Sequence, residues 1–240
     1  MKAIIPVAGF GTRIENIANG RPKALLPIKG RPLIENTIEK LNKLPEISEI
    51  VMITNGKYYD QFVQWKAESK SRLPITILNN GVLTNETRKG AIRDIGSCID
   101  KEDEIFLIYG DNLFTVDLRK VLDMYHEKKT VIIGTCDVHS VDAIKKLSAV
   151  QLDANNKVID FVEKPENPKS TLCGTGINIF TKEAVGLLKQ YIANHELNQD
   201  APGFFIQWLQ KRVPIHAYVI DGIKEKWYDI GAEEVYNQVK

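Results

Sequence analysis

A chain of 240 residues, of which 43% are hydrophobic, is long enough to form one large domain with a substantial buried core. Its 32 lysines and arginines nearly balance its 31 aspartates and glutamates, and a net charge of +1 lacks the basic excess of proteins that bind the nucleic-acid backbone. No apolar run approaches the ~20 residues of a membrane span, and the apolar N-terminal stretch is too short for a signal peptide. We therefore expect a cytoplasmic protein that binds neither nucleic acid nor membrane.

In the first half of the chain, apolar strands alternate with amphipathic helical stretches. Strands are expected at residues 2–7, 49–54, 74–78, 104–109 and 130–135, and helices at 32–43, 57–70, 87–99 and 117–128. This alternation predicts a Rossmann-like α/β fold, in which helices cover both faces of a mixed, mostly parallel central sheet.

The second half of the chain is less regular. Strands are expected at residues 147–152, 157–163, 173–180 and 214–220, and helices at 181–193, 202–212 and 231–239. The first three strands follow each other with few helical residues between them, which suggests a small added antiparallel layer. No linker, repeat or low-complexity tract divides the chain, so we predict a single domain over residues 1–240.

The three cysteines, Cys98, Cys136 and Cys173, are odd in number and far apart in the sequence. This pattern favours reduced thiols over disulfide bridges. We expect all three to be small core residues.

The segment after the first strand has the composition of a phosphate-binding loop. Gly9 and Gly11 lack the Cβ atoms that would keep a backbone from closing around an anion. Arg13 and Lys23 place one positive charge at each end of the same segment. A backbone cradle with two fixed cations suits a triphosphate, so the segment predicts a nucleotide site.

Other glycine-rich motifs fit this segment less well. A dinucleotide fingerprint requires a third glycine at the position of Ile14 and an acid after the second strand, where Asn55-Gly56 stands instead. A P-loop requires a Gly-Lys-Ser/Thr tripeptide, which the chain lacks. A plain strand-to-helix turn would explain the glycines but not Arg13 and Lys23.

A second motif, Tyr109-Gly110-Asp111, follows another expected strand. Ligands of parallel sheets bind beyond the carboxyl ends of the strands. The glycine-rich loop and Asp111 are therefore expected at the same rim of the sheet.

With these motifs the chain resembles the sugar nucleotidyltransferases, the nucleotide-sugar pyrophosphorylases such as glucose-1-phosphate thymidylyl- and uridylyltransferases. Their Gly-x-Gly-Thr-Arg loop followed by Pro-Lys corresponds to residues 9–13 and Pro22-Lys23. Four further blocks continue the likeness in the family's order: Tyr109–Asn112, Phe161–Pro165, Gly174–Gly176 and Trp227–Gly231. The resemblance covers essentially the whole chain and implies a nucleotide-binding part of about residues 1–135 and a sugar-binding part of about residues 136–240.

The resemblance implies that a sugar-1-phosphate oxygen attacks the α-phosphorus of a nucleoside triphosphate and expels pyrophosphate, in nucleotide-sugar and polysaccharide biosynthesis. Catalysis would rest on positioning and charge neutralisation by Arg13, Lys23 and Asp111. Arg13 would hold the leaving phosphates, and Lys23 would contact the α-phosphate and the incoming phosphate. The expected nucleotide-binding residues are Ala8, Gly9, Phe10, Gly11, Thr12, Arg13, Lys23, Asn80, Gly90 and Asp111.

Phosphate chemistry of this kind usually needs Mg²⁺, which takes one or two carboxylates and completes its shell with phosphate and water oxygens. The resemblance assigns Asp111 and Asp229 as the magnesium ligands. The alternatives are a helix N-cap for Asp111, a role that suits Asp117 better, and a turn aspartate before Gly231 for Asp229.

The resemblance also assigns residues to the sugar phosphate. Glu163 would accept hydrogen bonds from sugar hydroxyls and Lys164 would hold the phosphate, unless the two form an exposed charged pair at the end of a strand. The full expected sugar-phosphate set is Gly110, Glu163, Lys164, Gly176 and Trp227. The alternatives are a β-bulge for Gly176 and core packing for Trp227.

The base is the least determined part of the substrate. In the family it lies near Ala8 and Gly9 and near a segment after the third strand. Here that segment, residues 78–91, departs from the usual pattern and adds Arg88-Lys89, and Phe10 replaces a common glycine. The base, the sugar, the pathway and the formation of a homo-oligomer therefore stay open.

Three other functions compete with that of a sugar nucleotidyltransferase. A cytidylyltransferase that acts on a non-sugar phosphate such as phosphocholine would need an aromatic cage for the amine. A glycosyltransferase would need an Asp-x-Asp motif, where this chain has Asp111-Asn112-Leu113. A non-catalytic sensor of nucleotide sugars would not need the charged residues that the chain retains.

Overall fold

The computed structural model describes residues 1–240, which form a mixed central sheet of seven strands in the order β12-β8-β11-β6-β1-β4-β5. The strands are β1 (Lys2–Pro6), β4 (Glu49–Thr54), β5 (Ile75–Asn79), β6 (Ile105–Ile108), β8 (Val131–Asp137), β11 (Leu172–Phe180) and β12 (Ile215–Ile220). All neighbouring pairs are parallel except those of β11, which runs antiparallel to both β6 and β8. The predicted mixed, mostly parallel sheet is confirmed.

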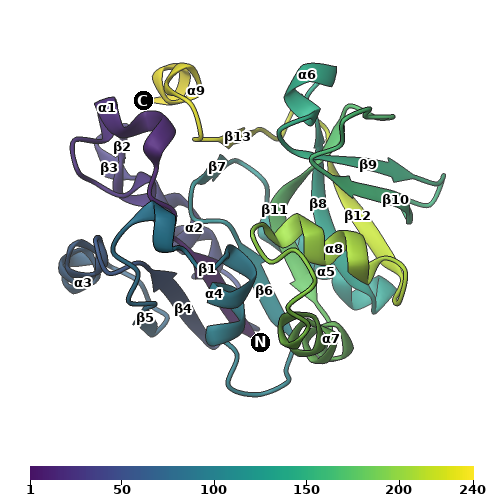
Figure 1. Cartoon of the computed structure of the whole chain (residues 1–240), viewed down its shortest axis with the longest axis horizontal. Coiled ribbons are helices and arrows are strands. Elements are labelled where there is room, and N and C mark those ends of the chain that lie inside the picture. Colours follow the sequence, from purple (N-terminus) through teal and green to yellow (C-terminus); the bar gives the residue numbers. More distant parts are fainter.

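Helices cover both faces of this sheet (Figure 1). The longer ones are α2 (Ile34–Leu41), α3 (Tyr59–Glu68), α4 (Ala91–Ser97), α5 (Leu118–Lys128), α7 (Lys182–Ala193) and α8 (Pro202–Leu209). Side chains of β1 alternate between two hydrophobic cores, because successive residues of a strand point to opposite faces. Ala3 and Ile5 pack in one core with α2, α3 and α5, whereas Ile4 packs in the other with α4, α7 and α8.

The expected antiparallel layer is smaller than the sequence suggested. It consists of β9 (Ser148–Leu152) and β10 (Val158–Glu163), which pair only with each other. The third expected strand of that layer, β11, lies inside the central sheet instead. Residues 175–180 of β11 are all buried, as expected of a strand covered on both faces. The boundary expected near residue 135 falls within β8, so the sheet takes strands from both expected parts.

Several short elements had no signal in the sequence. They are the strands β2 (Pro27–Ile28), β3 (Arg31–Pro32), β7 (Asn112–Phe114) and β13 (Trp227–Asp229), the helices α1 (Glu15–Ala18) and α6 (Val141–Ile144), and 3-10 helices at Thr12–Ile14, Lys23–Leu25 and Asn85–Thr87. The antiparallel pair of β7 and β13 joins two segments more than a hundred residues apart. This pair brings the end of the chain to the rim of the central sheet.

The last helix, α9 (Glu233–Val239), packs against the segment that follows the glycine-rich loop (Figure 1). Tyr236 and Val239 share a small hydrophobic core with Ile14 and Leu26. The Tyr236 hydroxyl also donates a hydrogen bond of 2.9 Å to the carbonyl of Pro27. Residues near the two ends of the sequence therefore form one structural unit.

Two local predictions are confirmed. The cysteines are free and buried. Asp117 is the N-cap of α5, where its carboxylate accepts a hydrogen bond of 3.0 Å from the Arg119 amide. Gly90, expected to bind nucleotide, is the N-cap of α4. None of the helices combines the length and the apolar character needed to cross a bilayer.

Candidate active site

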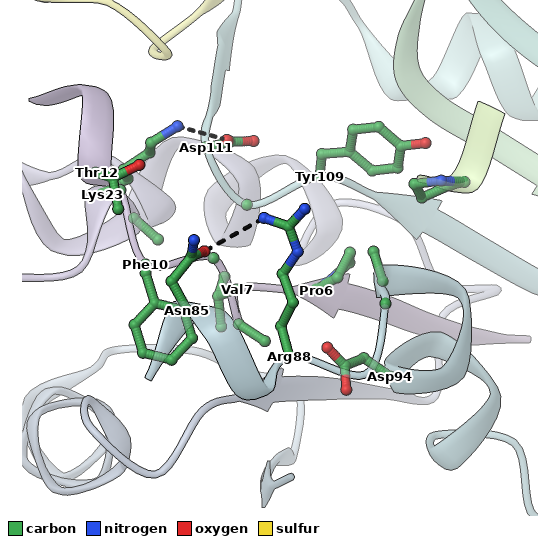
Figure 2. A pocket seen from close by; sticks show the side chains of 18 of the residues that line it. Pro6, Val7, Phe10, Thr12, Lys23, Asn85, Arg88, Asp94, Tyr109 and Asp111 are labelled. Carbon is green, nitrogen blue, oxygen red and sulfur yellow. Dashed lines mark hydrogen bonds and ion pairs between the residues drawn. The ribbon is translucent and has the colours of Figure 1, made fainter. Parts of the chain in front are cut away.

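A cavity of about 370 Å³ opens at the carboxyl ends of β1 and β6 (Figure 2). One wall is the glycine-rich loop, residues 7–13, and the segment Tyr109-Gly110-Asp111 forms another. Residues 85–94 and Asp200 contribute further lining. The two motifs predicted at one rim of the sheet thus face the same space.

The glycine-rich loop is held by its carbonyl groups. The Asn55 side chain donates 2.9 Å to the carbonyl of Ala8, and the Tyr58 hydroxyl donates 3.1 Å to that of Phe10. The backbone N–H groups of residues 8–12 donate no hydrogen bond within the protein. A fixed loop with five free donors is suited to bind an anion.

Lys23 crosses this loop at Gly11. Gly11 has a φ of +65°, and a Cβ there would lie 3.3 Å from Cγ of Lys23. The lysine side chain is only 14% exposed, and its Nζ lies 3.4 Å from Oδ2 of Asp111. Glycine therefore lets the lysine stem pass over the loop and places its charge at the end of β6.

The carboxylates of Asp111 and Asp229 lie close together because β7 pairs with β13. The Ile230 amide donates 3.0 Å to the carbonyl of Asp111, which fixes the two backbones side by side. Burial and the charge of Asp111 raise the pKa of Asp229 to about 6, while Lys23 and Arg13 act in the opposite direction.

Arg13 approaches Asp229 from the glycine-rich loop. A Cβ on Gly231 would lie 3.1 Å from Oδ2 of Asp229 and 3.2 Å from Nη2 of Arg13. Two cations from one end of the chain and two carboxylates from distant segments therefore converge beside the cavity.

The donor set at this point fits a divalent cation. Asp111 and Asp229 lie close enough to interact electrostatically, and burial together with the charge of Asp111 keeps the pKa of Asp229 raised although Lys23 and Arg13 lower it. Hard oxygen ligands of this kind suit Mg²⁺, which keeps several positions for water and phosphate oxygens. No third acid, histidine or cysteine joins the pair. A cation bound there would therefore depend on substrate oxygens.

Three of the residues expected at the sugar phosphate, Gly110, Glu163 and Gly176, lie near Tyr109. The Tyr109 amide donates 3.0 Å to the carbonyl of Gly176, and any side chain at Gly176 would overlap the tyrosine ring. Glu163, at the end of β10, acts electrostatically on the same tyrosine. Gly110 packs against Val7 too tightly for a Cβ. Only Gly110 of the expected sugar-phosphate set lines the 370 Å³ cavity itself.

The Gly174–Gly176 turn is a bulge in β11, where the register against β8 shifts. The carbonyl of Thr175 accepts hydrogen bonds from the Trp227 indole at 3.0 Å and from the Asn112 amide at 2.5 Å. The indole N–H of Trp227 therefore helps to fix the turn beside Tyr109.

The cavity lining also includes polar side chains from outside the predicted motifs, among them Asn85, Arg88, Asp94 and Asp200. Arg88 pairs with Asp200 at 3.1 Å, and Asp200 also lies 3.7 Å from Nζ of Lys164. The unusual Arg88-Lys89 pair was the only sequence signal for this network. Asn80, expected to bind nucleotide, lies behind the cavity wall and donates to Asp94 instead.

Glu163 gives a prediction on stability. The pKa of Glu163 is raised from 4.5 to about 7, mainly by burial. The charge of Lys164 opposes this rise and the charge of Asp200 adds to it. The folded protein therefore binds the proton of the Glu163 carboxyl more tightly than the unfolded chain does. At pH 4 the carboxyl is largely protonated in both states and lowers the free energy of unfolding little, whereas at pH 8 ionising it in the folded protein lowers that free energy by about 3 kcal/mol. We expect Glu163→Gln to raise the free energy of unfolding at pH 8 but not at pH 4.

Urea unfolding at the two pH values measures this difference. Glu166→Gln is the matched control, because Glu166 is exposed and should show no such dependence. Equal effects of Glu163→Gln at both pH values would contradict a raised pKa.

A family model described as nucleotidyl transferase matches residues 2–240. The bifunctional protein GlmU of Methanocaldococcus jannaschii is 32% identical over 191 residues, which are 79% of this chain and 42% of that protein. A bifunctional sugar-1-phosphate nucleotidylyltransferase/acetyltransferase of Sulfurisphaera tokodaii is 35% identical over 182 residues, 74% of this chain and 40% of that protein. The alignments thus span less than half the length of these two relatives.

The fold has a close counterpart among solved structures. A Bacillus anthracis protein assigned as a glucose-1-phosphate thymidylyltransferase superimposes with a TM-score of 0.83 at 24% identity, covering 100% of this chain and 93% of that one. The fold is thereby confirmed, and the family match confirms the resemblance found in the sequence. The chain belongs to the nucleotidyl transferase family.

Proposed function

We propose that this protein transfers a nucleotidyl group from a nucleoside triphosphate to a sugar-1-phosphate, giving a nucleotide sugar and pyrophosphate. The observation that carries the proposal is the convergence of Arg13, Lys23, Asp111 and Asp229 beside a loop with free N–H donors. The reaction crowds negative charge at one phosphorus, and such charge needs fixed donors and cations. The names of the two archaeal relatives are consistent with this chemistry only in part, since each describes a longer bifunctional protein.

Each charged group would have a distinct task. The free N–H groups of residues 8–12 and the guanidinium of Arg13 would hold the β- and γ-phosphates, which leave as pyrophosphate. Lys23 would contact the α-phosphate and the incoming phosphate, and so align attacking and leaving oxygens. Its Nζ is 3.4 Å from Asp111, which keeps it directed at this point.

Asp111 and Asp229 would hold Mg²⁺, which when bound neutralises charge on the phosphate oxygens. Two carboxylates alone leave most of the coordination shell to substrate and water oxygens. Binding of the triphosphate would therefore complete the ion's site.

The acceptor would lie next to Tyr109, at the junction of a nucleotide part (about residues 1–135) and a sugar part (about residues 136–240). Glu163 would accept hydrogen bonds from sugar hydroxyls, and Lys164 would exchange its contact with Asp200 for the sugar phosphate. The bulge fixed by Trp227 would let the backbone approach the sugar closely.

A substrate grid tests the proposal. Purified protein with Mg²⁺ is incubated with each of GTP, ATP, UTP, CTP and dTTP against a panel of sugar-1-phosphates, with phosphocholine as an additional acceptor. Release of pyrophosphate is followed by a coupled assay, and the product is identified by mass spectrometry. We expect release that needs both a triphosphate and a sugar-1-phosphate and that EDTA abolishes.

The same grid separates the alternatives. Release with phosphocholine alone would replace the sugar by an amine-bearing acceptor. Binding of nucleotide sugars without release in any combination would indicate a non-catalytic sensor.

A further inference from the structure

Asp94 has no role in the chemistry above, although it lines the cavity. It belongs to the first turn of α4, four residues after Gly90, and is only 8% exposed. Figure 2 shows its carboxylate projecting from the helix into the cavity. A buried carboxylate at a cavity wall is costly unless it receives hydrogen bonds, so its presence calls for a ligand or a structural partner.

One oxygen of the Asp94 carboxylate accepts a hydrogen bond, and the other accepts none. The Asn80 amide donates 2.9 Å to Oδ1 of Asp94, and Asn80 is itself fixed because its side-chain oxygen accepts 2.9 Å from the Val82 amide. No other hydrogen bond and no ion pair reaches the carboxylate, so Oδ2 has no partner within the protein. Asn80 thus orients Asp94 and leaves its accepting capacity for a ligand.

Asp94 lies at the end of the cavity that suits a base. In Figure 2 it is on the opposite side of the cavity from Lys23 and Asp111. A nucleotide whose phosphates occupy the glycine-rich loop extends its base away from those charges. An oriented acceptor at the far end therefore meets the base rather than the phosphates.

The bases differ in what they offer to a carboxylate, which only accepts hydrogen bonds. Guanine carries two adjacent donors, N1–H and the 2-amino group, which match the two carboxylate oxygens. Uracil and thymine offer one N–H between two carbonyl oxygens, and adenine and cytosine offer an amino group beside a ring acceptor. Acceptors that face the buried carboxylate would repel it.

We propose that Asp94, oriented by Asn80, selects a guanine nucleotide as the donor substrate. This inference rests on the proposed function, since it names the base of the same triphosphate. It predicts that both N–H groups of guanine contribute to recognition.

The wild-type protein tests the inference without any substitution. Binding of GTP, ITP, UTP, dTTP, CTP and ATP is measured by calorimetry, and kcat/KM is measured with each sugar-1-phosphate that the grid identifies. We expect GTP to exceed the pyrimidine nucleotides and ATP by about 100-fold or more, because a site built for hydrogen bonds rejects bases that cannot make them. ITP, which lacks only the 2-amino group, is expected to be about tenfold weaker than GTP.

A variant reverses the preference. In Asp94→Asn one carboxylate oxygen becomes an N–H donor, which suits xanthine, whose 2-oxygen replaces the amino group of guanine. We expect binding of GTP to fall about tenfold or more and binding of XTP to rise above it. Asp142→Asn, on the exposed helix α6, is the matched control and should leave the order of nucleotides unchanged.

Each outcome decides one question. Tighter binding of UTP, dTTP, CTP or ATP than of GTP by the wild-type protein overturns guanine selection. The proposed function stands in that case if the preferred nucleotide supports pyrophosphate release. Equal affinity for GTP and ITP also overturns it. Tight, selective GTP binding without release in any combination supports guanine selection and contradicts the proposed transfer. The wild-type panel decides the question even if Asp94→Asn fails to fold.

Discussion

We expect Lys23→Ala to lower the turnover number by about 10³-fold, because it removes a fixed cation from the point where negative charge would accumulate in the proposed reaction. The lysine stem is buried over Gly11 and its head is directed at Asp111, so its charge occupies a fixed position. Folding should be nearly unchanged, since the pair with Asp111 is partly exposed and contributes about 1 kcal/mol or less. Initial rates of pyrophosphate release at saturating substrates measure the effect.

Two comparisons sharpen this result. Lys66→Ala removes an exposed lysine on α3 and should leave turnover within about twofold of the wild-type value. Asp111→Asn should also reduce turnover strongly, and the double variant should lose less than the product of the single effects, because the two groups act on the same phosphates. Turnover of Lys23→Ala within threefold of the wild type would contradict the catalytic assignment.

Gly90→Ala is expected to lower the free energy of unfolding by about 2–4 kcal/mol. Gly90 has a φ of +96°, and a Cβ there would overlap the backbone carbonyl of Gln199. That carbonyl and the carbonyl of Asp200 accept the first free amides of α4, at 3.3 and 3.1 Å, and no side chain caps this helix. The substitution would therefore push the segment around residue 200 away from the start of α4 and break these two hydrogen bonds.

Urea unfolding followed by tryptophan fluorescence measures this loss. Gly186→Ala is the matched control within the same chain, because Gly186 lies inside α7 and a Cβ there meets only Glu102 at an ordinary distance of 3.5 Å. Alanine at that helical position should be neutral or stabilising by up to about 1 kcal/mol. A loss below 1 kcal/mol for Gly90→Ala would mean that the segment shifts freely, and the pairing of Asp200 with Arg88 would then not be fixed.

Much of the fold follows from the sequence, because strands and long helices carry strong local signals. The strand expected at 49–54 is β4 to the residue, and the helix expected at 202–212 begins at Pro202, which its fixed φ favours. The position of β11 could not be predicted in the same way. Its apolar pattern is that of any buried strand, and the order of strands depends on packing between distant segments.

The glycine-rich segment and its two cations could be recognised in the sequence for a related reason, since Gly9 to Lys23 lie within one short stretch. The approach of Asp229 to Asp111 depends instead on β7 and β13, three-residue strands without a periodic pattern. Asp94 gave no signal either. Its partner Asn80 and its burial come from the way α4 lies against the end of β5, and a single aspartate in a short helix looks like a solvent-exposed residue.

The pairing of β13 with β7 has a consequence for the order in which the protein matures. A nascent chain that has reached Ile220 already contains every strand of the central sheet, but it lacks Asp229 and the helix that supports Ile14. Such a chain could assemble its scaffold on the ribosome before the proposed pair of metal ligands, Asp111 and Asp229, is complete. The site would then be completed only by the segment that follows β12, after the strands of the central sheet are in place.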